Sequence, residues 1–187
     1  AASTELRARS ALDIALWDVL GKLTGQPISV LLGGRIRSQI PVYNTCAGNQ
    51  YVRGTKLGTT QNFGIASSGT DQNHEDLDRF LNDPVGLAGS LLDMGIDSMK
   101  IWPFDFAAES TQGQFISPAE LNKALAPFEA IKKEYGDRMQ ISAELHGMWN
   151  LSESLIICQA LDEIGMRWIE DPVFLTNPTG IQELKRN

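Results

Sequence analysis

The sequence lacks long apolar runs, and it lacks the N-terminal pattern of a secreted protein. No stretch approaches the roughly 18 to 20 consecutive apolar residues that a membrane-spanning helix needs. The N-terminus does not have the order of basic and then apolar residues that marks a signal peptide. We therefore expect a cytoplasmic protein with no membrane partner.

Basic residues and cysteines are also scarce. The 187 residues include 16 Lys and Arg against 23 Asp and Glu, a formal net charge of −7, and the basic residues are scattered. A nucleic-acid surface needs a basic patch or stripe, so nucleic acid is not an expected partner. Cys46 and Cys158 are isolated in apolar runs without C-x-x-C spacing, which predicts buried free thiols with no redox or metal role.

What the chain does contain is a regular alternation of short apolar runs and helical patterns. The N-terminal segment predicts an amphipathic helix that stops at Gly25, and Pro27 then opens a short helical turn closed by Gly33 and Gly34. A change of composition near residue 38 suggests a domain boundary.

The strands predicted beyond it are 40–46, 97–102, 139–145 and 166–172. The helices predicted there are approximately 75–94, 117–135, 150–164 and 178–186. Hydrophobic residues make up 42% of the chain, enough for a sizeable core, and the alternation predicts an α/β fold with parallel strands.

Residues 47–75 interrupt this alternation. The segment is rich in Gly, Thr, Ser, Asn and Gln and has no convincing periodicity. Loops of this length are usually lids, binding loops or disordered segments, so we expect either a lid over the strand ends or disorder.

Four βα units are too few to close an eight-stranded barrel. The chain also begins inside a predicted helix and stops inside another. We therefore expect it to be part of something larger, with both ends cut.

Two glutamates, Glu144 and Glu170, lie 26 positions apart near the ends of the last two predicted strands. A strand, crossover helix and parallel strand place consecutive strand ends side by side, so these carboxylates are candidate ligands of one divalent cation. The alternative is that each caps the following helix or forms an ion pair.

Lys100 and His146 are the candidate catalytic residues. A lysine in the middle of an apolar strand is costly to bury unless it meets an anion, which makes Lys100 a candidate ligand of a substrate carboxylate, or a base. His146 follows Glu144 by two residues and is a candidate general acid or base, although a histidine held only by loop backbone is the alternative. Asp171 is expected to point away from Glu170 because strand side chains alternate. Asp105 is expected to be a loop or capping residue.

The segments ALDIALWDVLGKLTGQPISVLLGG, IPVY, MKIW and WIEDP, in that order, resemble the mandelate racemase and muconate lactonising branch of the enolase superfamily. The resemblance covers nearly the whole chain except 47–75. It implies a modified TIM barrel with a capping domain. Residues 1–38 would be the last part of the capping domain and 39–187 the first half of the barrel.

The resemblance also implies the cofactor and the roles of the site residues. In that family three carboxylates at the ends of the third, fourth and fifth strands hold Mg2+, which stabilises the enediolate formed when a base removes the proton α to a carboxylate. Glu144 and Glu170 match the first two ligand positions, and the third is expected on a strand that this sequence does not reach. The chain as given is therefore expected to bind metal weakly and to turn over nothing.

The pattern departs from many members of the family on the second strand. Their second-strand base, the second lysine of Lys-x-Lys, is absent here because Trp102 follows Lys100 and Ile101. The run from Glu144 to His146 is instead similar to the Asp-x-His of mannonate dehydratases. This similarity implies that His146 acts as acid or base and that Lys100 polarises a substrate carboxylate.

Three functions follow from these expectations. The first is a Mg2+-dependent dehydratase of a sugar acid, a small-molecule carboxylate, which we expect to be a homo-oligomer when complete. The second is a racemase or epimerase that uses the same intermediate without eliminating water. The third is an inactive fragment or a binding module on a barrel scaffold.

Overall fold

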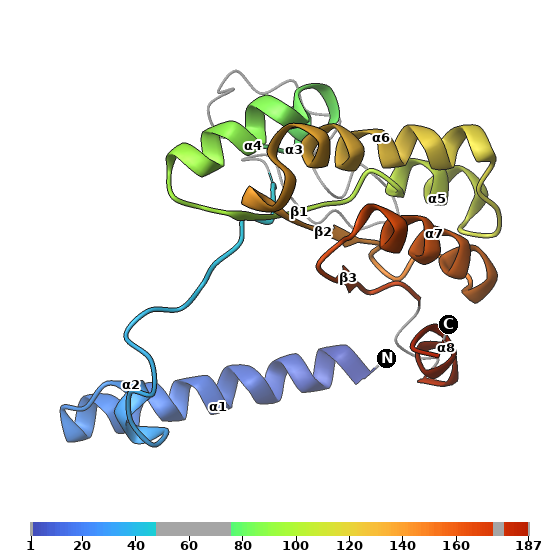
Figure 1. The fold of residues 1–187 in the computed structure, drawn as a ribbon. Helices are drawn as coiled ribbons and strands as arrows, with labels where there is room; N and C mark the ends of the chain where they lie inside the picture. Colours follow the sequence, from blue (N-terminus) through green and yellow to red (C-terminus); the bar gives the residue numbers. More distant parts are fainter. Residues whose placement is uncertain (1, 48–75, 174–177, 187) are drawn as a thin grey trace. The chain divides into compact units, whose positions relative to one another are not determined.

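The computed structural model describes residues 2–47, 76–173 and 178–186, and it divides into two compact units, Ala1–Pro41 and Val42–Asn187 (Figure 1). The predicted lid or disordered segment lies outside the described residues, apart from Ala47. Among the helices of the described parts, none is long and apolar enough to cross a membrane.

The first unit consists of two helices, as the sequence predicts. Helix α1 spans Ala2–Thr24 and the short helix α2 spans Ile28–Leu31. Between them Gly25 takes a φ of 64°, a left-handed conformation that glycine adopts without steric cost and that ends α1. The apolar side chains of α1 remain largely exposed, with Leu12 at 69% and Leu16 at 68%. Helix α2 therefore leaves the predicted apolar stripe of α1 uncovered.

The second unit is built on a parallel sheet of three strands in the order β1-β2-β3. Strand β1 spans Ser98–Ile101, β2 spans Gln140–Glu144 and β3 spans Ile169–Glu170. Both neighbouring pairs are parallel. Three of the four predicted strands and the parallel α/β arrangement are thereby confirmed.

The prediction of a strand at 40–46 is wrong. The segment forms only an isolated parallel bridge between Asn44 and Met99. Pro41 has no amide hydrogen to donate to a ladder. The Asn44 side chain also accepts a hydrogen bond from the Cys46 N–H at 2.6 Å, and Cys46 has a φ of 53°. Such a local side-chain bond competes with strand pairing, so the extended conformation ends there.

Helices follow each strand, and most lie where the sequence predicts them. The predicted ones are α3 (Asp76–Asn82), α4 (Pro84–Asp93), α6 (Pro118–Tyr135), α7 (Leu151–Ile164) and α8 (Pro178–Leu184). The helix expected over 75–94 is two helices, because Asp83 caps a new helix by accepting from the Gly86 N–H at 3.0 Å and Pro84 occupies its first position. Within the described residues two elements were not predicted, α5 (Asp105–Thr111) and the 3-10 turn Gly136–Arg138.

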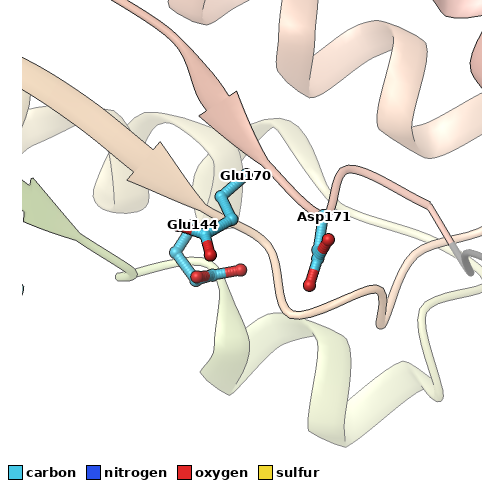
Figure 2. A group of neighbouring side chains, drawn as sticks. All are labelled: Glu144, Glu170 and Asp171. Carbon is cyan, nitrogen blue, oxygen red and sulfur yellow. The ribbon is translucent and has the colours of Figure 1, made fainter. Parts of the chain in front are cut away.

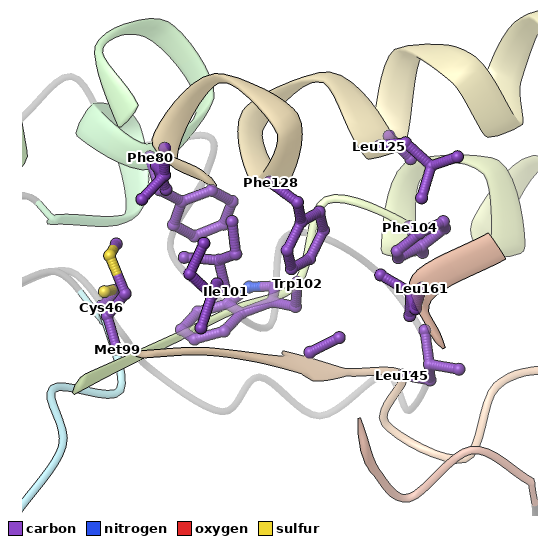
Figure 3. Close-up of a cluster of buried hydrophobic side chains, with 14 of the residues drawn as sticks. Cys46, Phe80, Met99, Ile101, Trp102, Phe104, Leu125, Phe128, Leu145 and Leu161 are labelled. Atoms are coloured by element: carbon purple, nitrogen blue, oxygen red, sulfur yellow. The ribbon is translucent and has the colours of Figure 1, made fainter. Parts of the chain in front are cut away.

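The core lies between the β1–β2 face and the helices above it (Figure 3). Met99, Ile101, Ile141 and Ala143 are buried in it together with aromatic side chains of the helices. Because strand side chains alternate, the strand residues next to them in sequence project from the other face of the sheet. These are Lys100, Ser142 and Glu144. The hydrophobic core therefore fixes which face carries the polar residues.

The two cysteines belong to the packing of this unit. Cys46 is fully buried and Cys158 is partly buried, and both are free thiols. Burial raises the pKa of both thiols. A raised pKa disfavours the thiolate, which is the reactive form. Cys46 is buried as predicted, whereas Cys158 is only partly buried.

Candidate active site

The ends of β2 and β3 bring two acidic side chains together. Glu144 is the last residue of β2, Glu170 is the last residue of β3, and the two are paired directly across the parallel ladder. One carboxylate oxygen of each lies within 4.8 Å of the other and of one oxygen of Asp171 (Figure 2). The side-by-side placement of Glu144 and Glu170 is the one that the parallel-strand argument predicts.

The prediction that Asp171 points away from Glu170 is wrong. Strand β3 ends at Glu170, and Asp171 has a φ of 43°, in the left-handed region. The alternation of side chains therefore stops between the two residues, and the Asp171 carboxylate joins the acidic group. The Asp171 carbonyl also accepts a hydrogen bond from the Gly147 N–H at 2.7 Å, which ties the loop after β3 to the loop after β2.

Lys100 projects from β1 toward the same carboxylates. Its Nζ donates to Oε2 of Glu144 at 2.7 Å and to Oε2 of Glu170 at 2.5 Å. The rings of Tyr43 and Trp168 lie 5.8 and 5.9 Å from the ammonium, within the range of cation–π attraction. Burial by itself would lower the pKa of Lys100, but the hydrogen bonds and charges of the two glutamates outweigh burial and raise it. Lys100 is therefore an ammonium held at the strand ends.

His146 lies in the turn directly after β2. Its backbone takes a φ of 49°, and its N–H donates to Oε1 of Glu144 at 3.0 Å. The ring nitrogen Nδ1 lies 2.8 Å from Oδ2 of Asp105, and the ring packs edge-to-face on Trp102 with 5.7 Å between centroids. Glu144 and His146 are therefore linked through the loop backbone, and the histidine side chain is partly buried.

The interpretation of Asp105 as a loop or capping residue is wrong. Asp105 is the first residue of α5, where Phe104 occupies the capping position and no side chain caps the helix. Its side chain is fully buried and meets the His146 ring. Its position in the sequence could have identified it as a site residue. Asp105 follows the end of a parallel strand, and Glu144 and Glu170 also lie at strand ends.

The aspartate and histidine change each other's protonation. Burial raises the pKa of Asp105, and the hydrogen bond to His146 opposes that rise without cancelling it. Burial lowers the pKa of His146, but the hydrogen bond and charge of Asp105, with the charge of Glu144, raise it above the ordinary value of 6.5. The environment therefore favours the protonated form of the imidazole.

One edge of the sheet thus gathers an ammonium, an imidazole and three carboxylates. The carboxylates could together hold a hard cation. Oxygen ligands of this kind suit Mg2+. An imidazole at the same edge can exchange a proton with a small molecule. The candidate residues Glu144, Glu170, Lys100 and His146 are all brought to this edge, whereas His74, to which no chemistry is assigned, lies outside the described residues.

Two family models match the chain. The model described as "Enolase C-terminal domain-like" matches residues 85–187. The model of the mandelate racemase / muconate lactonizing enzyme N-terminal domain matches residues 1–33. Together they cover the sheet, nearly all of α4, the helices that follow it and the two N-terminal helices.

Known proteins with similar sequences and structures agree with these models. A crystal structure of an enolase of the mandelate racemase subgroup from Agrobacterium tumefaciens is 40% identical with a TM-score of 0.75, and the similarity covers 97% of this chain and 40% of that one. The D-mannonate dehydratase of Xanthomonas oryzae pv. oryzicola is 24% identical over 185 residues, which are 97% of this chain and 41% of that protein. The D-gluconate/D-galactonate dehydratase of Picrophilus torridus is 26% identical over 181 residues, which are 96% of this chain and 38% of that protein.

The chain therefore spans about two fifths of the length of the relatives it matches. Its three parallel strands and their helices correspond to part of a TIM-type (β/α) barrel, as the sequence predicts.

Proposed function

The chain belongs to the mandelate racemase and muconate lactonising enzyme family of the enolase superfamily, and we propose that it is part of a Mg2+-dependent dehydratase of sugar acids. Residues 1–38 would complete a capping domain, and 39–187 would form the first half of the barrel. Turnover then needs these residues within a complete barrel. The homo-oligomer and the cytoplasmic location remain predictions.

The observation that carries the proposal is the convergence of Glu144 and Glu170 next to His146. Two oxygens that bind one Mg2+ from opposite sides lie about 4 Å apart, so a separation within 4.8 Å needs only a small adjustment of the side chains. The donors are carboxylate oxygens, which Mg2+ prefers. The residues present therefore fit the ion. Glu144 and Glu170 would hold it, with Asp171 close enough to supply a third oxygen.

The bound ion would supply positive charge to offset the negative charge that develops on a substrate carboxylate when its α proton leaves. The base that takes this proton would come from the rest of a complete barrel. His146 would protonate the departing β-hydroxyl as a general acid, the role that its raised pKa favours. Lys100 has three N–H donors, two of which meet Glu144 and Glu170. We assign the third to the substrate carboxylate.

The names of two relatives support the choice of reaction, since one is a D-mannonate dehydratase and the other a D-gluconate/D-galactonate dehydratase. They also support the substrate class, a small polyhydroxy carboxylate. The identities of 24% and 26% leave the particular sugar acid open to the assay.

A racemase or epimerase is the second candidate. The observation in its favour is the 40% identity to a protein of the mandelate racemase subgroup, which exceeds the identity to the two dehydratases. Both reactions begin with loss of the α proton.

Product analysis of a complete barrel that carries these residues separates the two reactions. Incubation with a panel of sugar acids and Mg2+ in D2O is expected to yield a 2-keto-3-deoxy acid. Deuterium at the α carbon without loss of water would instead assign racemisation. If no acid of the panel reacts in either way, the proposed function is wrong and the chain belongs to an inactive or binding protein.

A further inference from the structure

Asp105 and His146 come from different strand ends and meet inside the second unit. Asp105 begins the helix after β1, and His146 lies in the turn after β2. Their side chains join at 2.8 Å between Oδ2 and Nδ1. Forty-one residues therefore separate two groups that the fold makes direct neighbours.

The Asp105 carboxylate is committed to this contact. The residue has no exposed surface, and among the described residues its other oxygen, Oδ1, has no hydrogen-bond partner. A buried carboxylate with so few partners is costly to fold. The cost would be avoided by an apolar residue of similar size, so the position is poorly explained by stability alone.

The contact determines which nitrogen of the neutral ring carries the proton. An ionised carboxylate only accepts hydrogen bonds, so the ring nitrogen that faces it must be N–H. Nδ1 is then the donor, and the unprotonated nitrogen of the neutral imidazole is Nε2. The His146 backbone N–H is held by Glu144, and the Trp102 ring packs against the imidazole.

We infer that Asp105 is a positioning residue that fixes the Nδ1–H tautomer and the orientation of His146, so that proton exchange with a substrate takes place at Nε2. The inference deepens the proposed function, because the catalytic meaning of that nitrogen rests on His146 being the acid or base. The tautomer itself does not depend on the reaction and can be measured without substrate.

The test is long-range 1H–15N NMR of protein labelled with 15N-histidine, in the presence of a metal chelator and at a pH where the ring is neutral. The His146 signals are identified by their loss in His146→Asn. We expect at least about a tenfold preference for Nδ1–H in the unmodified protein, since a charge-assisted hydrogen bond favours that form. An even mixture or a preference for Nε2–H would overturn the inference.

Two variants complete the test. Asp105→Leu removes the acceptor at similar size and is expected to abolish the Nδ1–H preference. Retention of that preference in the variant would overturn the inference. The matched control is Ser154→Ala, which also removes a fully buried polar group, but one whose hydrogen bond goes to the Pro172 carbonyl. It is expected to leave the tautomer unchanged.

An even mixture or an Nε2–H preference in the unmodified protein overturns the inference even if Asp105→Leu does not fold. A protein with the predicted tautomer but no turnover of any sugar acid would leave the positioning role standing and remove the proposed function. An active dehydratase with the opposite tautomer would leave the proposed function standing and remove the positioning role.

Discussion

The ammonium of Lys100 lies 2.7 Å from Oε2 of Glu144, and the two side chains are only 7% and 5% exposed. They form a buried ion pair between neighbouring strands, and a second glutamate, Glu170, shares the same ammonium. Such a pair costs desolvation when it forms, but removing one partner leaves an uncompensated charge. The acid pair at the strand ends is therefore stabilised by a cation that belongs to the chain itself.

Replacing Lys100 by Met is expected to destabilise the metal-free protein. Breaking a buried pair costs several kcal/mol, and we expect about 2 to 3 kcal/mol because Glu170 is 37% exposed. Urea unfolding in the presence of a chelator measures the change. The control is Lys132→Met, which breaks the solvent-exposed pair with Asp137 and should have little effect. Equal effects of the two substitutions would contradict the ion-pair argument.

The same Lys100→Met substitution is expected to strengthen binding of a divalent cation. The ammonium contacts one oxygen of Glu144 and one of Glu170, so it competes with a metal ion for those oxygens and repels it. Removing a full positive charge a few ångströms away should tighten Mn2+ binding by at least about tenfold. Isothermal titration calorimetry with Mn2+ measures the affinity of the parent and of the variant. Unchanged or weaker binding would show that the ammonium and the metal do not share these oxygens.

The imidazole of His146 is expected to titrate above the ordinary value of 6.5. Burial lowers its pKa and the charge of Lys100 lowers it further, but the hydrogen bond and charge of Asp105 and the charge of Glu144 raise it more. NMR titration of the ring protons in the presence of chelator gives the midpoint. Asp105→Asn should lower it, and a midpoint at or below 6.5 in the unmodified protein would contradict this reading of the site.

The raised pKa also has a consequence for stability. A group whose folded pKa exceeds its unfolded pKa stabilises the fold fully below the unfolded value, and this contribution disappears as the pH rises through the folded value. The difference in unfolding free energy between the unmodified protein and His146→Asn should therefore shrink above pH 6.5. A difference that grows with pH would mean that the ring is held neutral.

His146→Asn is expected to lower turnover in a complete barrel by about 10²-fold or more, because a general acid or base usually contributes that much. Lys132→Met is the control, since Lys132 pairs with the exposed Asp137 and does not belong to the site. Steady-state kinetics on the sugar acid identified by product analysis gives both rates. A His146→Asn rate within a factor of about two or three of the parent would return the histidine to a structural role.

Much of this geometry could be predicted from the sequence because it depends on periodic or local rules. Glu144 and Glu170 meet since two strands of a parallel sheet end beside each other. Helix α6 begins where Ser117 and Pro118 predict it, and Ser117 accepts from the Glu120 N–H at 3.2 Å. Both results need only the strand period and the chemistry of a helix start.

The remaining features depend on backbone angles and tertiary contacts that no short pattern specifies. Asp171 joins the acidic group because its φ is positive, which ends the strand alternation. Asp105 lies in a seven-residue helix too short to show a helical period, and its partner His146 is 41 residues away. Pairings over such distances become visible only when the chain is folded.

The most direct measurement is a Mg2+ titration by calorimetry of a complete barrel that carries these residues and of its Glu170→Gln variant. The central claim is that Glu144 and Glu170 hold one divalent cation between neighbouring strand ends. The variant keeps the size of the side chain and removes one charged ligand, so its affinity should fall by at least about tenfold. Glu163→Gln, which makes the same change at an exposed position outside the acidic group, should bind like the parent. Equal affinity of the Glu170→Gln variant and the parent would contradict the account.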